Sequence, residues 1–180
     1  MNIKNAQQEM LGNFLGGFTG QLVSGMIWLA SASYRLWISP RYALGVLLFG
    51  SMAIFPLTQL VLRLLGRSAE AGPSHHLWSP GSQTVFTISI NFLHVGAAAL
   101  YNKDRFYPAE MIIFGAHYLP FITIYGMQLF AILAGLLVTA GTGLAFYFPS
   151  SGNIGAWITV LVLLIIAFIG RTVVRNEEKP

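Results

Sequence analysis

A forty-residue stretch, from Ala109 to Phe148, carries a single charged side chain, Glu110. One continuous helix of that length would measure about 60 Å, twice the ~30 Å hydrocarbon thickness of a bilayer. The stretch must therefore fold back, and Gly126 is the residue at which we expect the turn. Only 9% of the 180 residues are charged and 55% are hydrophobic, whereas a soluble domain is about 25% charged. These values exclude an ordinary soluble enzyme, a disordered chain and a nucleic-acid-binding domain, and they indicate a membrane protein of several spans.

Six apolar segments predict an all-α polytopic membrane helix bundle, a single integral membrane domain over residues 1–180 with six transmembrane helices. The predicted helices cover residues 11–33, 42–65, 84–101, 109–125, 128–148 and 154–174. Loops rich in glycine, proline or charged residues separate most of them. Because the fourth and fifth segments are near the short limit for spanning, the alternative is five spans and a re-entrant segment broken at Pro120.

Six spans would place both termini on the same side of the membrane. That side would collect Lys4, Arg63, Arg67, Arg171, Arg175 and Lys179, and the other side Arg35, Arg41, Lys103 and Arg105. Since basic residues favour the cytoplasmic side, we expect a multi-pass protein of the cell membrane with both termini in the cytoplasm. Its basic residues would contact lipid headgroups. The chain has no cysteine, which excludes disulfides and thiolate metal sites.

Two of the predicted helices carry small residues at four-residue spacing. These ladders are Gly12, Gly16, Gly20 and Ser24 in the first helix, and Ala131, Gly135, Thr139 and Gly143 in the fifth. Small residues on one helix face let helix backbones approach closely within a membrane. The ladders therefore predict close helix packing, either inside the bundle or against a second copy in a homo-oligomer.

Polar side chains from three predicted helices are expected to lie at one depth. They are Gln21, Ser24, Asn91, His94 and His117. A rise of 1.5 Å per residue from the predicted helix ends places them about 10–18 Å below the surface that holds Lys103. Glu110 lies two turns from His117 on the same face, and would sit above this layer at the surface.

Three interpretations of this polar layer remain open. It can be a structural network that fixes helix register, because buried polar groups in membranes need partners. It can be a cavity for a small solute or a proton path, for which histidine is suited. A metal or catalytic site would use His94, His117 and Glu110, but the spacing matches no zinc-protease motif. We therefore predict no metal and no cofactor.

Three stretches resemble a family of small uncharacterised bacterial integral membrane proteins. They are residues 16–25 with Trp28, residues 106–109, and residues 115–121 with 125–127. The resemblance implies a six-helix protein of the bacterial inner membrane and carries no known activity. It also directs attention to Tyr118, beside Gln21, Ser24 and His117.

The function that we predict is small-solute or ion handling through a polar intramembrane pocket. In this role His94 and His117 would titrate or contact the ligand, and Glu110 would gate the mouth or attract cations there. Three further residues, Gln21, Ser24 and Asn91, would orient the ligand. One alternative is a non-catalytic membrane partner or scaffold subunit. The other is an intramembrane enzyme that acts on a lipid, for which the sequence offers no activated nucleophile or catalytic motif, so a non-catalytic role is favoured.

Overall fold

The computed structural model describes residues 2–67, 77–148 and 152–177. For part of the helix at 78–101, His94 included, it describes the backbone and not the side chains. All regular secondary structure within these ranges is helical. The predicted all-α fold class is therefore confirmed for the described residues.

The helices follow one another with short connections, except between α3 and α4. In chain order they are α1 (Ile3–Asn13), a 3₁₀ turn (Leu15–Gly17), α2 (Phe18–Trp37), α3 (Pro40–Leu64), α4 (Trp78–Tyr101), a 3₁₀ turn (Lys103–Arg105), α5 (Phe106–His117), α6 (Leu119–Tyr125), α7 (Leu129–Tyr147) and α8 (Gly152–Glu177).

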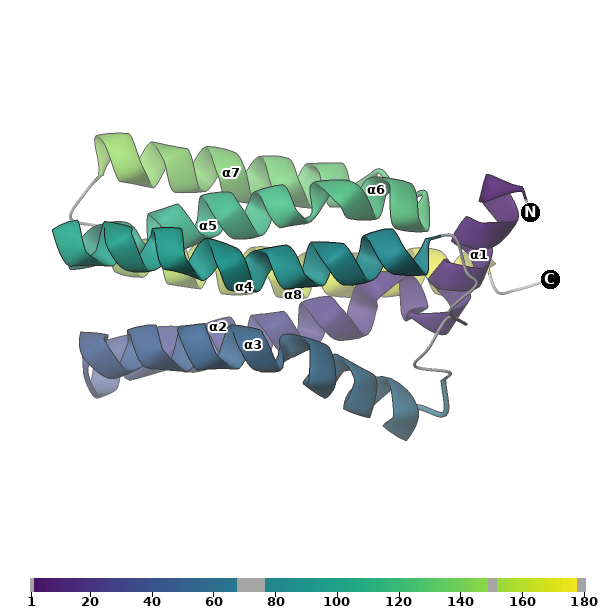
Figure 1. The fold of residues 1–180 in the computed structure, drawn as a ribbon, viewed down its shortest axis with the longest axis horizontal. Coiled ribbons are helices and arrows are strands. Elements are labelled where there is room, and N and C mark those ends of the chain that lie inside the picture. The colour runs from purple at the N-terminus through teal and green to yellow at the C-terminus, as the bar shows by residue number, and fades with distance from the viewer. Residues whose placement is uncertain (1, 68–76, 149–151, 178–180) are drawn as a thin grey trace.

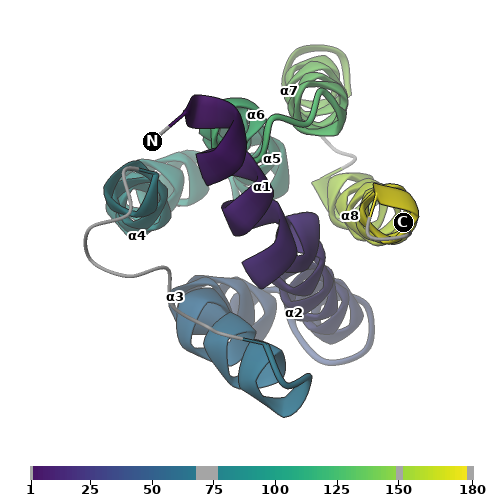
Figure 2. The ribbon, with the colours of Figure 1, turned by 90° about the vertical axis from the view of Figure 1, so that its right-hand side faces the viewer.

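The long helices run antiparallel along the bundle, and α6 continues the direction of α5 (Figure 1). The first residues of α1 and the last turn of α8 lie at the same end, which we call the terminal end. Figure 2 looks at the terminal end and shows α1 lying across it. The opposite end holds the turn at Lys103–Arg105 and is called the turn end.

Three helices of the described chain are long and apolar enough to cross a membrane. They are Pro40–Leu64, Leu129–Tyr147 and Asn153–Asn176. These helices also expose large apolar side chains, for example Phe49 on α3, Phe146 on α7 and Phe168 on α8. Such surfaces are unusual for a soluble protein and suit contact with lipid. The helices therefore have the properties expected of a membrane protein.

The first predicted helix, 11–33, is wrong in its bounds. Leu15, Gly16 and Gly17 have φ values of 52°, 60° and 78°, and three successive left-handed residues cannot continue an α-helix. The chain instead ends α1 at Asn13 and starts α2 at Phe18. Gly12 and Gly16 consequently do not share a helix face with Gly20, so the predicted ladder of four does not exist.

The ladder on α7 faces outward and does not pack within the chain. A Cβ built on Gly135 or on Gly143 would meet no atom of the described chain within 4 Å. The close helix contacts are made by Gly115 on α5 and Gly141 on α7 instead. A Cβ on Gly115 would lie 2.8 Å from Leu137 Cβ, which is closer than real Cβ atoms approach. These two glycines therefore set the close contact between α5 and α7.

The turn predicted at Gly126 is confirmed, because Gly126 has a φ of 68° and caps α6. The predicted helix 109–125 is interrupted near Pro120, where only the re-entrant alternative had a break, since α5 ends at His117 and α6 begins at Leu119. Proline has no N–H to donate and clashes with the preceding turn, which explains the break. The chain does not turn back there, however, because α5 and α6 together run the length of the bundle (Figure 1).

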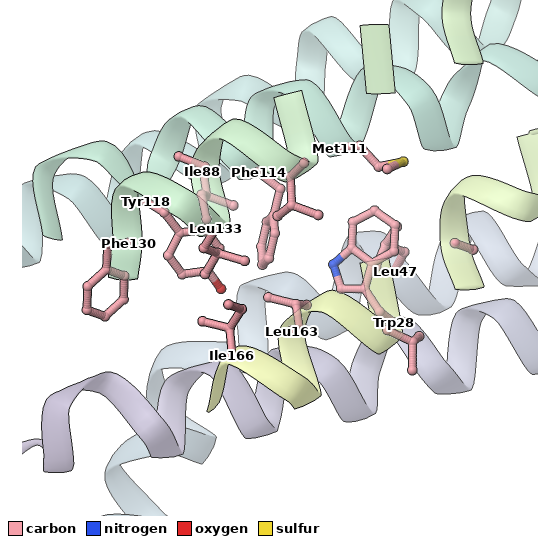
Figure 3. Close-up of a cluster of buried hydrophobic side chains, with 14 of the residues drawn as sticks. Trp28, Leu47, Ile88, Met111, Phe114, Tyr118, Phe130, Leu133, Leu163 and Ile166 are labelled. Carbon is pink, nitrogen blue, oxygen red and sulfur yellow. The ribbon is translucent and has the colours of Figure 1, made fainter. Parts of the chain in front are cut away.

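The apolar core lies between α2, α5, α7 and α8. Figure 3 shows Trp28 of α2, Phe114 of α5 and Leu163 of α8 pointing toward one another. The three side chains are at most 1% exposed, and the Trp28 and Phe114 ring centroids are 5.7 Å apart. This packing fixes α2 against α5 and thereby positions the polar residues described next.

Candidate functional site

A cavity of about 120 Å³ lies beside the second half of α3. α3 contains Pro56 and bends in this region, so that its last turns diverge from α4 (Figure 1). Proline causes such bends because its ring clashes with the carbonyl group one turn earlier. The cavity is lined by residues of α2, α3, α4, α5 and α6, and by Phe130 of α7.

The helix α1 closes the terminal end of this cavity. Its Met10 and the following Phe14 line the cavity and are almost fully buried. The Gln7 Nε2 group donates a 2.7 Å hydrogen bond to the Thr123 carbonyl of α6. Arg67, after α3, donates a 3.5 Å hydrogen bond to the Gly12 carbonyl. These contacts attach α1 to the elements on two sides of the cavity.

Polar side chains line the cavity, and aromatic rings cover one wall. The polar residues are Thr19, Gln21 and Ser24 on α2, Ser51, Thr58 and Gln59 on α3, Ser82 on α4, and His117 with Tyr118 at the α5–α6 junction. The aromatic residues are Phe14, Phe55, Phe114, Phe121, Tyr125 and Phe130. Among the lining residues that the structure describes, none is Asp, Glu, Lys or Arg.

Several polar atoms of the lining are buried without a partner. Within the described residues, Thr19 Oγ1, Ser51 Oγ, Thr58 Oγ1, Gln59 Oε1 and His117 Nδ1 make no hydrogen bond. Thr19 is only 1% exposed and Ser51 only 6%. Leaving such a group unsatisfied costs about 1–3 kcal/mol. The five residues that carry these atoms all line the cavity, so unpartnered polar groups are concentrated around it.

His117 is held by contacts on both sides of its ring. Its ring centroid lies 6.3 Å from that of Phe114 and 5.4 Å from that of Phe121. These ring contacts restrict the orientation of the imidazole, whose buried Nδ1 has no hydrogen-bond partner in the described chain.

Tyr118 joins the polar and aromatic walls. Its hydroxyl lies close to the Ser24 side chain of α2. Its ring lies 6.1 Å from Phe130 and 6.1 Å from Phe121, measured between centroids. The break before Pro120 positions Tyr118 between the two helices, so the local distortion of the chain places this side chain in the cavity wall.

The structure brings together four of the seven residues predicted for the site. Gln21, Ser24, His117 and Tyr118 all line the cavity. Asn91 is half-buried and does not line it, and the side chain of His94 lies outside the described residues. Glu110 is 1% exposed and is not part of the lining, so it does not lie at the surface as predicted.

The depth arithmetic failed because the predicted end of the first helix was wrong. α2 continues to Trp37, four residues beyond Ser33, which moves Gln21 and Ser24 about 6 Å further from the turn end. The cavity consequently extends toward the terminal end, where Met10 and Ser82 line it. The described lining includes no residue of the turn end near Lys103, where the mouth was expected.

The sequence analysis missed the polar residues of α3. Ser51 and Thr58 are seven residues apart and so share one helix face. Together with Gln59 they interrupt an otherwise apolar helix next to Pro56. This combination of a polar face and an internal proline was the available signal.

The turn end has a closed network instead of a cavity. Arg35 of α2 forms an ion pair with Asp104, and its guanidinium lies 5.5 Å from the centroid of the Tyr107 ring. The Ser31 and Tyr107 hydroxyl groups are 2.7 Å apart. These contacts connect α2 to α5 and to the turn before it.

No curated protein and no solved structure shows significant similarity to the chain. A family model matches residues 3–173, nearly the whole chain, and its description is a family of unknown function. This match confirms the expected resemblance to an uncharacterised family. The chain therefore belongs to the family of unknown function DUF7010.

Proposed function

We propose that this protein is a multi-pass membrane protein that binds a small, uncharged polar solute in the cavity beside α3. The observation that carries the proposal is that five residues of the cavity lining each carry a buried polar atom without a partner in the described chain. Buried polar groups without partners lower stability. A protein that retains them together is expected to use them, because a working site exchanges stability for function.

An uncharged solute fits the lining better than an ion does. The described lining has no carboxylate, ammonium or guanidinium group, and an unpaired ion is costly to place in a low-dielectric interior. Hydroxyl, amide and imidazole groups can form hydrogen bonds with a neutral molecule, whose burial costs less free energy than the burial of an ion. Phe121, Tyr125 and Phe130 add an apolar wall. The pocket therefore favours solute handling over ion handling.

Six spans in the bacterial inner membrane are the topology that we propose. α2 has 20 residues and α4 has 24, so each is about 30 Å long or more. α5 and α6 have 12 and 7 residues and together cover a similar length. Together with the three helices already noted, these helices give six passes, which place both termini on one side of the membrane. The distribution of basic residues favours the cytoplasm as that side. Lipids would contact the apolar outer faces.

A cavity-filling substitution tests the proposal. A Cβ at Gly20 would lie 3.9 Å from Thr58, which is ordinary contact, so Gly20→Leu directs a side chain into the cavity. Gly135→Leu is the matched control, because no described atom lies within 4 Å of its Cβ position. Saturation-transfer NMR in detergent would be recorded with acetamide, acetone, glycerol, acetate and methylammonium. We expect at least one neutral solute to give a signal that Gly20→Leu abolishes and Gly135→Leu retains. No signal sensitive to Gly20→Leu would overturn the proposal.

A second candidate function, a partner subunit or homo-oligomer, is favoured by one observation. Gly135 and Gly143 lie on the outward face of α7, and no described atom comes within 4 Å of their Cβ positions. Such open glycines allow a second helix to approach closely. Cross-linking in membranes, compared between the wild type and Gly135→Leu, would reveal an assembly through this face. The third interpretation, a lipid-acting enzyme, gains no supporting contact from the cavity.

A further inference from the structure

The path by which a solute reaches the cavity beside α3 depends on where the lining is exposed, and it bears on the proposed solute-binding function, which it presupposes. At the terminal end, Met10 and Phe14 line the cavity and are only 3% and 7% exposed. Toward the turn end the lining includes Phe114, which is 1% exposed and packs against Trp28. Both ends of the cavity are therefore closed by packed side chains in the described chain.

The lining is most exposed on α3 and α4. Phe55 of α3 is 38% exposed, and Thr58, one turn further on, is half-buried. Gly81 and Ser82, which α4 contributes to the lining, are also half-buried. The bend at Pro56 carries the last turns of α3 away from α4 (Figure 1). The cavity therefore opens between these two helices, on the side of the bundle.

This opening faces the bilayer in the proposed topology, because its rim belongs to the apolar outer face of α3. Met52 and Leu60, on either side of Phe55 in the sequence, are 58% and 53% exposed. Met52 is also the middle residue of α3 (Pro40–Leu64), a helix apolar enough to cross a membrane. Phe55 lies about 5 Å beyond this midpoint, which is well inside a hydrocarbon layer of about 30 Å.

Stacked aromatic rings form one wall of the cavity. The Phe121 and Tyr125 ring planes differ by 12° and their centroids are 5.7 Å apart. The Tyr125 and Phe130 planes differ by 23°, with centroids 5.3 Å apart. A wall of this kind suits a further aromatic ring, which gains stacking in addition to apolar burial. An engineered apolar cavity of about 150 Å³ binds benzene, so a volume of about 120 Å³ suits a molecule with a single ring.

We infer that the cavity takes small neutral molecules with one aromatic ring, and that they enter from the bilayer through the opening between α3 and α4. Such molecules dissolve in membranes and reach the opening by lateral diffusion. A charged molecule is excluded for two reasons. It does not dissolve in the hydrocarbon layer that the opening faces, and it meets no opposite charge in the described lining.

Photolabelling of the full chain in liposomes of phosphatidylcholine and phosphatidylglycerol tests the inference. Two probes share the same ring and azide group. Phenyl azide is neutral and dissolves in the bilayer, whereas 4-azidobenzenesulfonate is charged and stays in water. The labelled residues are identified by peptide mass spectrometry. We expect phenyl azide to label the aromatic wall, at Phe121, Tyr125 and Phe130, and the outer face of α3, and we expect the sulfonate to label neither.

A matched pair of glycine substitutions on α4 tests the opening itself. Gly81→Leu adds a side chain there, and a Cβ at Gly81 would be in ordinary contact, 3.8 Å from Ile124. Gly96→Leu is the control, because Gly96 does not line the cavity and no described atom lies within 4 Å of its Cβ position. Gly81→Leu should lower labelling of the wall, relative to the outer face, by about fivefold or more. Gly96→Leu should not change this ratio. If Gly81→Leu does not fold, Ser82→Leu at the next lining position takes its place.

The outcomes separate this inference from the solute-binding function. An unchanged ratio in Gly81→Leu, or equal labelling of the wall by both probes, would overturn entry from the bilayer. The solute site would remain if Gly20→Leu abolishes the labelling. If phenyl azide labels the outer face of the wild type but not the wall, the aromatic class is wrong. The NMR experiment with Gly20→Leu then still decides the solute-binding function. Labelling of the wall that persists in both Gly81→Leu and Gly20→Leu would contradict the entry path and the site together.

Discussion

The Ser31 hydroxyl of α2 lies 2.7 Å from the Tyr107 hydroxyl of α5. Ser31 also donates a 2.8 Å hydrogen bond to the Ala43 carbonyl of α3, so it accepts the hydrogen of Tyr107. Both residues are fully buried. This contact connects three helices at the turn end, and its atoms are satisfied, unlike those of the cavity. The Ser31–Tyr107 contact is therefore a satisfied structural contact, whereas five residues that line the cavity each carry an unpartnered polar atom in the described chain.

Removing the Tyr107 hydroxyl should destabilise the protein modestly. Tyr107→Phe removes one hydrogen bond and keeps the ring packing against Trp28. Side-chain hydrogen bonds in membrane proteins average about 0.6 kcal/mol, and the net value in proteins is about 1 kcal/mol. We expect a melting temperature lower by about 2–4 °C, measured in detergent by tryptophan fluorescence. Tyr147→Phe, at an 80% exposed position, should have no effect, and an equal loss in both variants would contradict the assignment.

The glycines between α5 and α7 should not tolerate a methyl group. A Cβ on Gly141 would lie 2.8 Å from the Pro108 carbonyl oxygen, which is backbone and cannot move aside. Overpacking of this kind costs about 1–3 kcal/mol. Gly115→Ala and Gly141→Ala should therefore lower the melting temperature, whereas Gly135→Ala should be neutral or stabilising because its position is open. Equal stability of Gly141→Ala and Gly135→Ala would refute the close contact.

The helix class and the turns were predictable because they depend on local chemistry. The apolar runs, Gly126 and the break at Pro120 each act through the backbone of a few residues. The start of α2 was not predictable in the same way. A left-handed Leu15 costs about 1–2 kcal/mol, and the chain accepts it because Leu15 and Phe14 become buried. This gain in apolar burial can be seen only from the tertiary packing.

Only part of the cavity lining was predictable, because the rest also depends on tertiary packing. The predicted depths grouped His117 with Gln21 and Ser24, and the resemblance to the family added Tyr118; all four line the cavity. The relative depth of residues on different helices was harder to predict, because each predicted helix end carries its own error. An error of four residues at the end of α2 was enough to shift the predicted depth of Gln21 and Ser24 by about 6 Å. The contribution of α3 depends on the bend at Pro56, whose direction the sequence does not specify.

Because the chain has no cysteine, a single introduced thiol can report access to the cavity. Thr58→Cys places a thiol in the lining, and Ser31→Cys places one in the closed network, where Ser31 is fully buried. We expect methyl methanethiosulfonate to modify Thr58→Cys much faster than Ser31→Cys, as measured by mass spectrometry. Adding Gly20→Leu to Thr58→Cys should slow the reaction. Equal rates in the two single variants would show that the cavity is not accessible.

The proposed topology makes a prediction about the two ends of the bundle. Lys4 and Lys103 are both exposed and lie at opposite ends. In intact bacterial cells, a membrane-impermeant maleimide should label Lys103→Cys and should label Lys4→Cys only after permeabilisation. The reverse pattern would place the termini outside. Labelling of both variants in intact cells would contradict a bundle that spans the membrane from end to end.

His117 should contribute more to binding than to stability. Its Nδ1 has no partner in the described chain, and Phe is similar in shape and can keep the contacts with Phe114 and Phe121. His117→Phe also removes a buried unsatisfied atom, which offsets the polar interactions lost with the imidazole. We expect the free energy of unfolding to change by less than about 1 kcal/mol, while acetamide binding is lost. His117→Ala is the control, because it leaves a void that costs about 2 kcal/mol or more. If His117→Phe is as unstable as His117→Ala, the histidine is a structural residue, and the polar layer would then favour the partner-subunit role over solute binding.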